Sequence, residues 1–181
     1  MTTNEFSDSE LLILGLISEM PRHGYELEQV IEKRVMREWT QIGFSSIYYV
    51  LGKLEKKGLV SASQPETAKS KKRYTLTEKG QKVLIDQTLA AVANVQPTYP
   101  SLLLGMINLS ALDRDQVLAA LNARREAVTA EMERIKEIHF DQQPLPDHVD
   151  AIFEYSIGQL TAESYWINRT YNYLETKAWL D

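Results

Sequence analysis

The sequence contains no cysteine, which excludes disulfide scaffolds, thiol nucleophiles and cysteine-ligated zinc or iron–sulfur sites. No apolar run approaches the roughly 20 residues that a membrane-spanning helix needs. The amino terminus is polar and acidic, without the basic and then apolar order of a secretory signal. Hydrophobic residues make up 44% and charged residues 25% of the 181 positions, ordinary globular values. We therefore expect a folded cytoplasmic protein that makes no contact with a membrane.

Features that would indicate catalysis are also scarce. The eight glycines are scattered and never form the phosphate-binding loop of a dinucleotide fold or a P-loop. One group of acidic residues and histidines spans residues 137–150. Within it, Glu137 and His139 point about 200° apart on a helix, so they do not converge unless the following loop folds back. We therefore expect no enzyme activity, no cofactor and no metal site.

The net charge of −5 is unevenly distributed along the chain. Residues 33–82 carry 12 basic and 4 acidic side chains, a net charge of +8. Residues 86–181 carry 7 basic and 14 acidic side chains. A basic segment attached to an acidic remainder indicates a local surface for a polyanion on a body that avoids nonspecific binding.

Two helices are predicted near the amino terminus. Residues 10–19 are apolar almost all round, which is typical of a buried helix, and Ser7 or Asp8 can cap it. Residues 25–35 follow after a tight turn and place one broad apolar stripe opposite charged side chains. This pattern predicts an amphipathic second helix.

A third helix and a basic hairpin are predicted next. The helix should begin at Ser45 or Ser46, and apolar residues from Ile47 to Leu54 recur at the spacing of one helical face. Residues 59–63 and 73–76 read as two short strands joined by a basic turn. Three helices followed by a hairpin give a winged-helix order with a two-stranded wing.

The remaining chain is expected to be a helical tail. We predict a winged helix-turn-helix domain over residues 1–85, a connecting helix and linker over 86–112, and a helical dimerisation domain over 113–181. Two long segments of the tail repeat apolar residues at alternating steps of three and four, which is typical of coiled coils. We expect them to join two copies of the chain, with an intramolecular bundle as the alternative. The residues assigned to dimerisation are Leu118, Leu121, Val128, Met132, Ile135, Phe153, Ile157, Leu160, Ile167, Tyr171 and Leu174.

The first 85 residues also carry a set of short motifs. They are His23-Gly24-Tyr25-Glu26-Leu27, Ser46-Ile47-Tyr48, Leu51, Leu54-Glu55, Gly58-Leu59-Val60, Tyr74-Thr75-Leu76-Thr77 and Gly80. Together they resemble the PadR family of bacterial transcriptional regulators, and the two long tail helices resemble its longer subgroup. The resemblance implies a homodimeric winged helix-turn-helix repressor, or less often an activator. In some members a small molecule such as a phenolic acid releases the protein from its operator.

The third helix and the hairpin are the expected contacts with double-stranded DNA. A helix with one buried face can enter the major groove, which is about 12 Å wide, and hydroxyls at its start reach phosphates or base edges. The basic hairpin is expected to meet phosphates or the minor groove. Two heads spaced by one helical turn of DNA, about 34 Å, would read a palindromic operator. The residues assigned to DNA are Ser45, Ser46, Tyr48, Tyr49, Lys53, Lys69, Lys71, Lys72 and Arg73.

Two further hypotheses concern other partners. Most aromatic rings of the tail lie in its last helix, where an aromatic effector can stack, although packing at an interface is the alternative. The residues assigned to an effector are Tyr155, Trp166 and Tyr173. The alternative to a DNA-binding regulator is a helical interaction module whose head docks protein. The net charge of +8 over residues 33–82 favours DNA.

Overall fold

The computed structural model describes residues 6–63 and 72–177, and the chain divides into two compact units, Met1–Gln96 and Pro97–Asp181. The structure is mainly helical with one small antiparallel sheet, which confirms the predicted fold class. Within the described ranges, no helix has the length and apolar character needed to cross a lipid bilayer.

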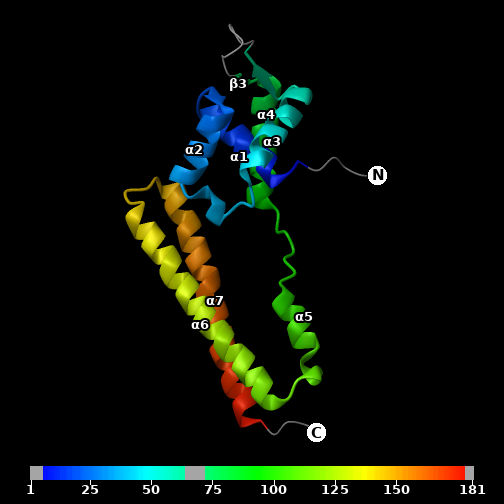
Figure 1. Ribbon diagram of the computed structural model, residues 1–181, viewed down its shortest axis with the longest axis vertical. Coiled ribbons are helices and arrows are strands. Elements are labelled where there is room, and N and C mark those ends of the chain that lie inside the picture. The colour runs from blue at the N-terminus through cyan, green and yellow to red at the C-terminus, as the bar shows by residue number, and fades with distance from the viewer. Residues whose placement is uncertain (1–5, 64–71, 178–181) are drawn as a thin grey trace. The chain divides into compact units, whose positions relative to one another are not determined.

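The N-terminal unit combines four α-helices with a small sheet (Figure 1). Its elements are α1 (Asp8–Glu19), β1 (Arg22–His23), α2 (Gly24–Lys33), the 3-10 helix η1 (Met36–Glu38), α3 (Phe44–Lys56), β2 (Val60–Ala62), β3 (Arg73–Leu76) and α4 (Glu78–Ala93). The strand order is β1-β3-β2, with antiparallel pairing throughout. This is the predicted winged helix-turn-helix order, but the sheet has three strands where the sequence predicted two.

Helix α1 begins with a reciprocal cap. The Ser7 hydroxyl accepts a hydrogen bond from the Glu10 N–H at 3.3 Å, and the Glu10 carboxylate accepts one from the Ser7 N–H at 2.9 Å. Such a capping box gives partners to N–H groups that the helix itself cannot satisfy. The helix then packs into the core of the head, whose fully buried aliphatic side chains include Ile13, Leu14, Ile17, Leu27, Ile31, Ile47, Leu51 and Leu54.

Two features near the amino terminus differ from the prediction. Strand β1 occupies part of the expected tight turn and pairs Arg22 with Tyr74 and His23 with Arg73. A strand of two residues has no alternating pattern to detect, and its partner comes much later in the chain. The second helix ends at Lys33 and does not reach Val35, which adopts a φ of 53° in the left-handed region. That conformation is rare for a β-branched residue and marks a sharp change of chain direction.

Helix α3 has the predicted buried stripe but begins slightly earlier than predicted. Ile47, Leu51 and Leu54 are all fully buried, which confirms the inward face. The N-cap is Gly43, so Ser45 and Ser46 lie inside the first turn instead of capping it.

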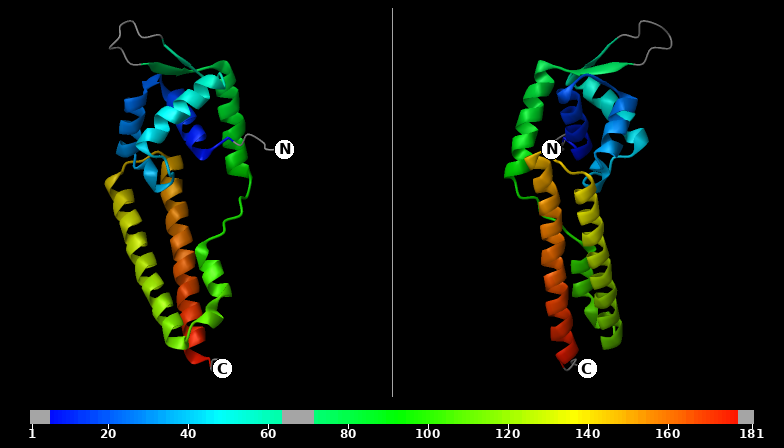
Figure 2. Two further views of the ribbon diagram at one scale, coloured as in Figure 1. Left: turned by 45° about the vertical axis from the view of Figure 1, so that its right-hand side comes forward. Right: turned by 90° about the vertical axis from the view of Figure 1, so that its left-hand side faces the viewer.

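The C-terminal unit is dominated by a pair of long antiparallel helices. Its elements are α5 (Ser101–Ile107), the 3-10 helix η2 (Leu109–Ala111), α6 (Arg114–Asp141) and α7 (Asp147–Thr176). Figure 2 shows α6 and α7 side by side in both views. Arg114 at the start of α6 donates to the Glu175 carbonyl near the end of α7, as an antiparallel pair requires.

The two predicted seams face each other within one chain. Leu121, Val128 and Ile135 of α6 are buried, and so are Phe153 and Ile167 of α7. The intramolecular contact that the sequence left as an alternative is therefore present. The other seam residues assigned to dimerisation are partly buried, namely Leu118, Met132, Ile157, Leu160, Tyr171 and Leu174. Their predicted role between two copies of the chain stays a prediction.

Arg125, a charged residue of the first seam, has two partners within the α6–α7 pair. Arg125 donates to Asn122 on its own helix. Its guanidinium carbon lies 5.3 Å from the centroid of the Tyr171 ring on α7. Beside it, Arg124 donates to Glu163 at 2.6 Å, which adds an ion pair between the two helices. These polar contacts fix which residues of α6 lie opposite which residues of α7.

Candidate nucleic-acid interface

The outward face of α3 carries hydroxyl groups at its amino-terminal end. Ser45 is exposed and Ser46 partly exposed. Tyr48 is 49% exposed and Tyr49 is 73% exposed. The structure therefore places four of the five contact residues predicted in α3 on one accessible surface, opposite the buried stripe, and Lys53 is the fifth.

Tyr48 is held on one side by the start of α2. A Cβ added to Gly24 would lie 2.6 Å from Cε1 of Tyr48, so the ring occupies the space that any other residue would fill. The Phe44 ring meets Tyr48 edge to face, with 5.9 Å between the ring centroids. Tyr25, Lys72 and Tyr74 complete a shallow hollow beside these groups. The Tyr48 ring thus has a defined position although half of it is exposed.

The basic hairpin is partly described. Lys69 and Lys71 lie outside the described residues. The Lys72 ammonium lies 3.4 Å from the Glu55 carboxylate of α3, and the Lys72 carbonyl oxygen lies 3.0 Å from Nδ1 of His23. Arg73 is exposed, and its N–H donates to the Ser63 hydroxyl across the hairpin at 3.1 Å. These contacts connect the hairpin to both α3 and the start of α2.

A buried ion cluster joins α3 to α1 (the Glu10 cluster, made of Glu10, Lys53 and Lys57). The Glu10 side chain is 0% exposed. Lys53 donates to it at 2.9 Å and Lys57 at 2.5 Å. Burial raises the pKa of Glu10, but hydrogen bonds from Lys57, the Ser7 N–H and Lys53 outweigh it, so the pKa falls from 4.5 to about 2. Glu10 is therefore a carboxylate at neutral pH.

The sequence did not reveal this cluster. Ser7 and Glu10 match the spacing of a capping box, a signal that could have identified Glu10 as a capping residue. Nothing in the sequence indicates that its partners lie 43 and 47 residues later. Lys53, predicted to meet the DNA backbone, has its ammonium on Glu10 instead of free in solvent. The predicted contact of Lys53 with DNA would require its ammonium to leave Glu10.

The three residues assigned to an effector do not form one site. Trp166 and Tyr173 line a shallow hollow on α7 together with Tyr165, Arg169 and Thr170. Tyr155 is exposed but lies about three helical turns, or roughly 16 Å, before Trp166 along the same helix. The structure thus brings together two of the three predicted residues and adds a guanidinium beside them.

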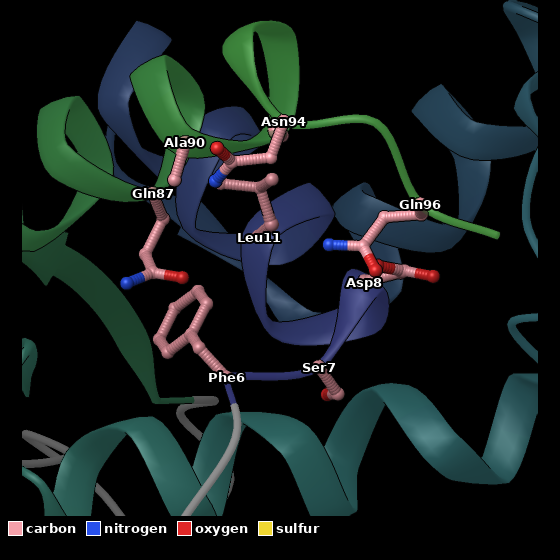
Figure 3. A pocket seen from close by; sticks show the side chains of 9 residues that line it. Phe6, Ser7, Asp8, Leu11, Gln87, Ala90, Asn94 and Gln96 are labelled. Atoms are coloured by element: carbon pink, nitrogen blue, oxygen red, sulfur yellow. The ribbon is translucent and has the colours of Figure 1, made fainter.

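A second hollow lies within the N-terminal unit, between the start of α1 and the second half of α4. Figure 3 shows its lining, which mixes the apolar side chains of Phe6 and Leu11 with the amides of Gln87, Asn94 and Gln96. Asp8 contributes a carboxylate to the same rim. This hollow could not be predicted from the sequence, because its walls come from residues about 80 positions apart.

His139, Gln143 and Asp150 form a polar cluster at the turn between α6 and α7. Nε2 of His139 lies 2.5 Å from Oδ1 of Asp150, and the Gln143 amide donates to Asp150 at 2.9 Å. The hydrogen bond with His139 holds the pKa of Asp150 below its usual value. The His139 ring stacks on Phe153 at 4.7 Å between centroids. In the part of the chain that the structure describes, no three histidine, aspartate or glutamate side chains gather to hold a metal ion.

Part of the chain matches a known protein family. Residues 13–86 match the model of the Transcriptional regulator PadR-like family. The matched segment contains α3, both strands of the hairpin and most of α1. A comparison with curated proteins gave no significant match.

Solved structures show that the whole fold is shared. The chain resembles Bacillus subtilis PadR in complex with operator DNA, with a TM-score of 0.72 and 20% identity over 91% of this chain and 98% of the other. It resembles the same protein in complex with p-coumaric acid, with a TM-score of 0.75 and 19% identity over 92% and 98%. It also resembles the Vibrio cholerae virulence activator AphA, with a TM-score of 0.74 and 16% identity over 94% and 100%.

Proposed function

We propose that this chain, which matches the PadR-like family of transcriptional regulators over residues 13–86, acts as a homodimeric repressor that binds operator DNA. The observation that carries this proposal is the two-sided character of α3. One side is fully buried in the core at Ile47, Leu51 and Leu54, and the other presents serine and tyrosine hydroxyls to solvent. A helix with that division can enter the major groove and leave the head intact.

In the proposed interface, α3 and the wing make different kinds of contact with DNA. Ser45, Ser46, Tyr48 and Tyr49 carry neutral hydrogen-bonding groups, which suit base edges and phosphates. Lys72 and Arg73, with Lys69 and Lys71 beyond the described residues, supply the positive charge that phosphates attract. The contact of Lys72 with Glu55 supports this arrangement because it connects the wing to α3. The competing hypothesis, a head that docks protein, gives no reason for the +8 charge of residues 33–82.

Replacing Lys71, Lys72 and Arg73 together by alanine should weaken binding to all DNA sequences alike. Each lost phosphate contact reduces the slope of log K against log salt by about 0.9, so we expect a slope flatter by roughly two to three. Fluorescence anisotropy with a labelled duplex, at several salt concentrations, measures it. Because Lys72 and Arg73 are exposed, thermal stability should change little. An unchanged slope would show that the wing does not contact DNA phosphates.

The proposed dimer forms through the tail. Phe153 and Ile167 are already buried between α6 and α7, so a second copy would contact the outer side of α7. Ile152, Tyr155 and Tyr165 are exposed there and offer apolar surface. Sedimentation equilibrium of the full chain should give about twice the 20.7 kDa mass of the monomer at micromolar concentration. A monomer mass throughout would contradict the dimer and, with it, the reading of a palindrome by paired heads.

The proposed effector is a small aromatic acid that releases the protein from its operator. The hollow around Trp166 and Tyr173 supports this, since it combines ring faces with the Arg169 guanidinium, which suits a carboxylate. The solved PadR structure with p-coumaric acid, at 19% identity, makes phenolic acids the first compounds to test.

A panel of phenolic acids should therefore quench the fluorescence of the tail and lower DNA affinity at the same concentrations. Trp166→Phe should abolish most of the fluorescence change, and Trp39→Phe in the N-terminal unit is the matched control that should retain it. Titrations followed by tryptophan emission and by anisotropy of a labelled operator measure the two effects. No response to any acid of the panel would count against an aromatic effector.

A further inference from the structure

Two lysines, Lys53 in the last turn of α3 and Lys57 directly after this helix, are turned toward Glu10 of α1. The Lys53 and Lys57 side chains are 32% and 22% exposed, and both ammonium groups contact Glu10. Lys57 also lies over the Phe6 ring, 5.3 Å from its centroid. Lys56, between them in sequence, is exposed. The positive charge at the carboxyl end of α3 is therefore split between one accessible lysine and two that face α1.

The carboxylate of Glu10 holds these lysines firmly because it is buried. It accepts hydrogen bonds from the Ser7 N–H and from the two lysines, and its side chain has no exposed surface. An ionised carboxylate removed from water requires charged or hydrogen-bonding partners at each oxygen. Release of either lysine toward a phosphate would leave one oxygen of Glu10 without its cation. For Lys53 and for Lys57, leaving Glu10 in order to bind a DNA phosphate is therefore unfavourable.

We propose that Glu10 is a positioning residue that keeps Lys53 and Lys57 out of the DNA interface and so limits binding to nonspecific DNA. The inference rests on the proposed function, since it assumes that α3 faces DNA. A lysine meets a phosphate on any sequence, so each free lysine adds affinity without selectivity. With the Glu10 cluster intact, the helix presents mainly the hydroxyls of Ser45, Ser46, Tyr48 and Tyr49, whose hydrogen bonds depend on what they meet.

The salt dependence of DNA binding separates this role from a merely structural one. We would compare wild type, Glu10→Gln, Lys53→Gln and the double variant on a duplex of arbitrary sequence. Lys53→Gln should leave the slope of log K against log salt unchanged, because the Lys53 ammonium of the wild type is bound to Glu10 and contacts no phosphate. Glu10→Gln should steepen the slope by about one to two and raise nonspecific affinity several-fold at low salt. The slope of the double variant should be flatter than that of Glu10→Gln by about one.

Controls guard against effects of folding and of overall charge. Glu133→Gln removes one exposed negative charge from α6 and should leave the slope as in wild type. Circular dichroism at the assay temperature establishes that each variant is folded. Lys53→Gln keeps the contact between Lys57 and Glu10, so it still decides the matter if Glu10→Gln does not fold.

Two results would overturn the proposal while the proposed function stands. One is a slope flatter by about one in Lys53→Gln alone, because Lys53 would then already contact a phosphate. The other is an unchanged slope in folded Glu10→Gln. Failure of the proposed function looks different: the wild-type protein itself would show no salt-dependent binding to DNA, and the inference would fall with it.

Discussion

Replacing Gly80 by alanine is expected to unfold the head at temperatures where the wild type is stable. A Cβ at this position would lie 2.0 Å from the Leu59 carbonyl oxygen, 3.0 Å from its carbonyl carbon and 2.8 Å from Cδ1 of Leu76. The carbonyl cannot yield cheaply, because it accepts a hydrogen bond from the Thr77 N–H at 3.1 Å. We expect a loss of about 3 kcal/mol or more in the free energy of unfolding.

Thermal and urea unfolding followed by circular dichroism measure this loss, which corresponds to a midpoint lower by more than about 12 °C for a domain of this size. Gly15→Ala in α1 is the matched control. Its Cβ meets nothing within 4 Å, so the gain in helix propensity of up to about 1 kcal/mol should make that variant slightly more stable. A Gly80→Ala protein within about 1 kcal/mol of wild type would show that the contact of α4 with the β2 side of the head is looser than described.

Replacing Glu10 by glutamine should cost about 3 kcal/mol of stability at pH 7 and only a small fraction of that at pH 2. The fall in the pKa of Glu10 from 4.5 to about 2 sets this size, at about 1.4 kcal/mol for each unit. Because the folded pKa lies below the unfolded one, the stabilisation is complete above pH 4.5. It is lost as the pH falls from about 4.5 toward 2, since the unfolded chain then binds the proton more readily.

Urea unfolding of both proteins between pH 7 and pH 2 tests this prediction. The curves of stability against pH should converge in the acid range. Glu55→Gln is the matched control, because Glu55 also meets a lysine, Lys72, but both side chains are more than a third exposed. An exposed pair of that kind contributes about 0–1 kcal/mol, so this variant should stay close to wild type. A constant difference between wild type and Glu10→Gln at every pH would mean that the carboxylate charge is not what stabilises the head.

The sequence predicted those parts of the head that depend on local patterns. The stripe from Ile47 to Leu54 recurs at helical spacing, and the structure buries it fully. Ser7 was one of two predicted caps of the first helix, and its hydroxyl accepts a hydrogen bond from the Glu10 N–H at 3.3 Å. Caps and stripes involve residues within a few positions of each other, so one sequence is enough to show them.

The features that the sequence missed depend on contacts between distant residues. Strand β1 exists because Arg22 and His23 pair with β3, and two residues carry no periodicity of their own. The direction of the Lys53 side chain is set by Glu10, which lies 43 residues earlier. The heptad spacing of the tail correctly indicated two helices with apolar seams. Spacing alone does not say whether a seam meets its own chain or a second copy, because both bury the same side chains.

Binding to DNA through α3 and the wing is the central claim, and a gel shift tests it most directly. The purified full chain would be mixed with DNA from upstream of its own gene and of the neighbouring genes, with competitor DNA, at 50 and 200 mM salt. We predict a discrete complex that survives the competitor and weakens by about a hundredfold or more at the higher salt, as several phosphate contacts require. Weak retention without a discrete complex, equal for all fragments, would contradict the claim and favour a head that docks protein.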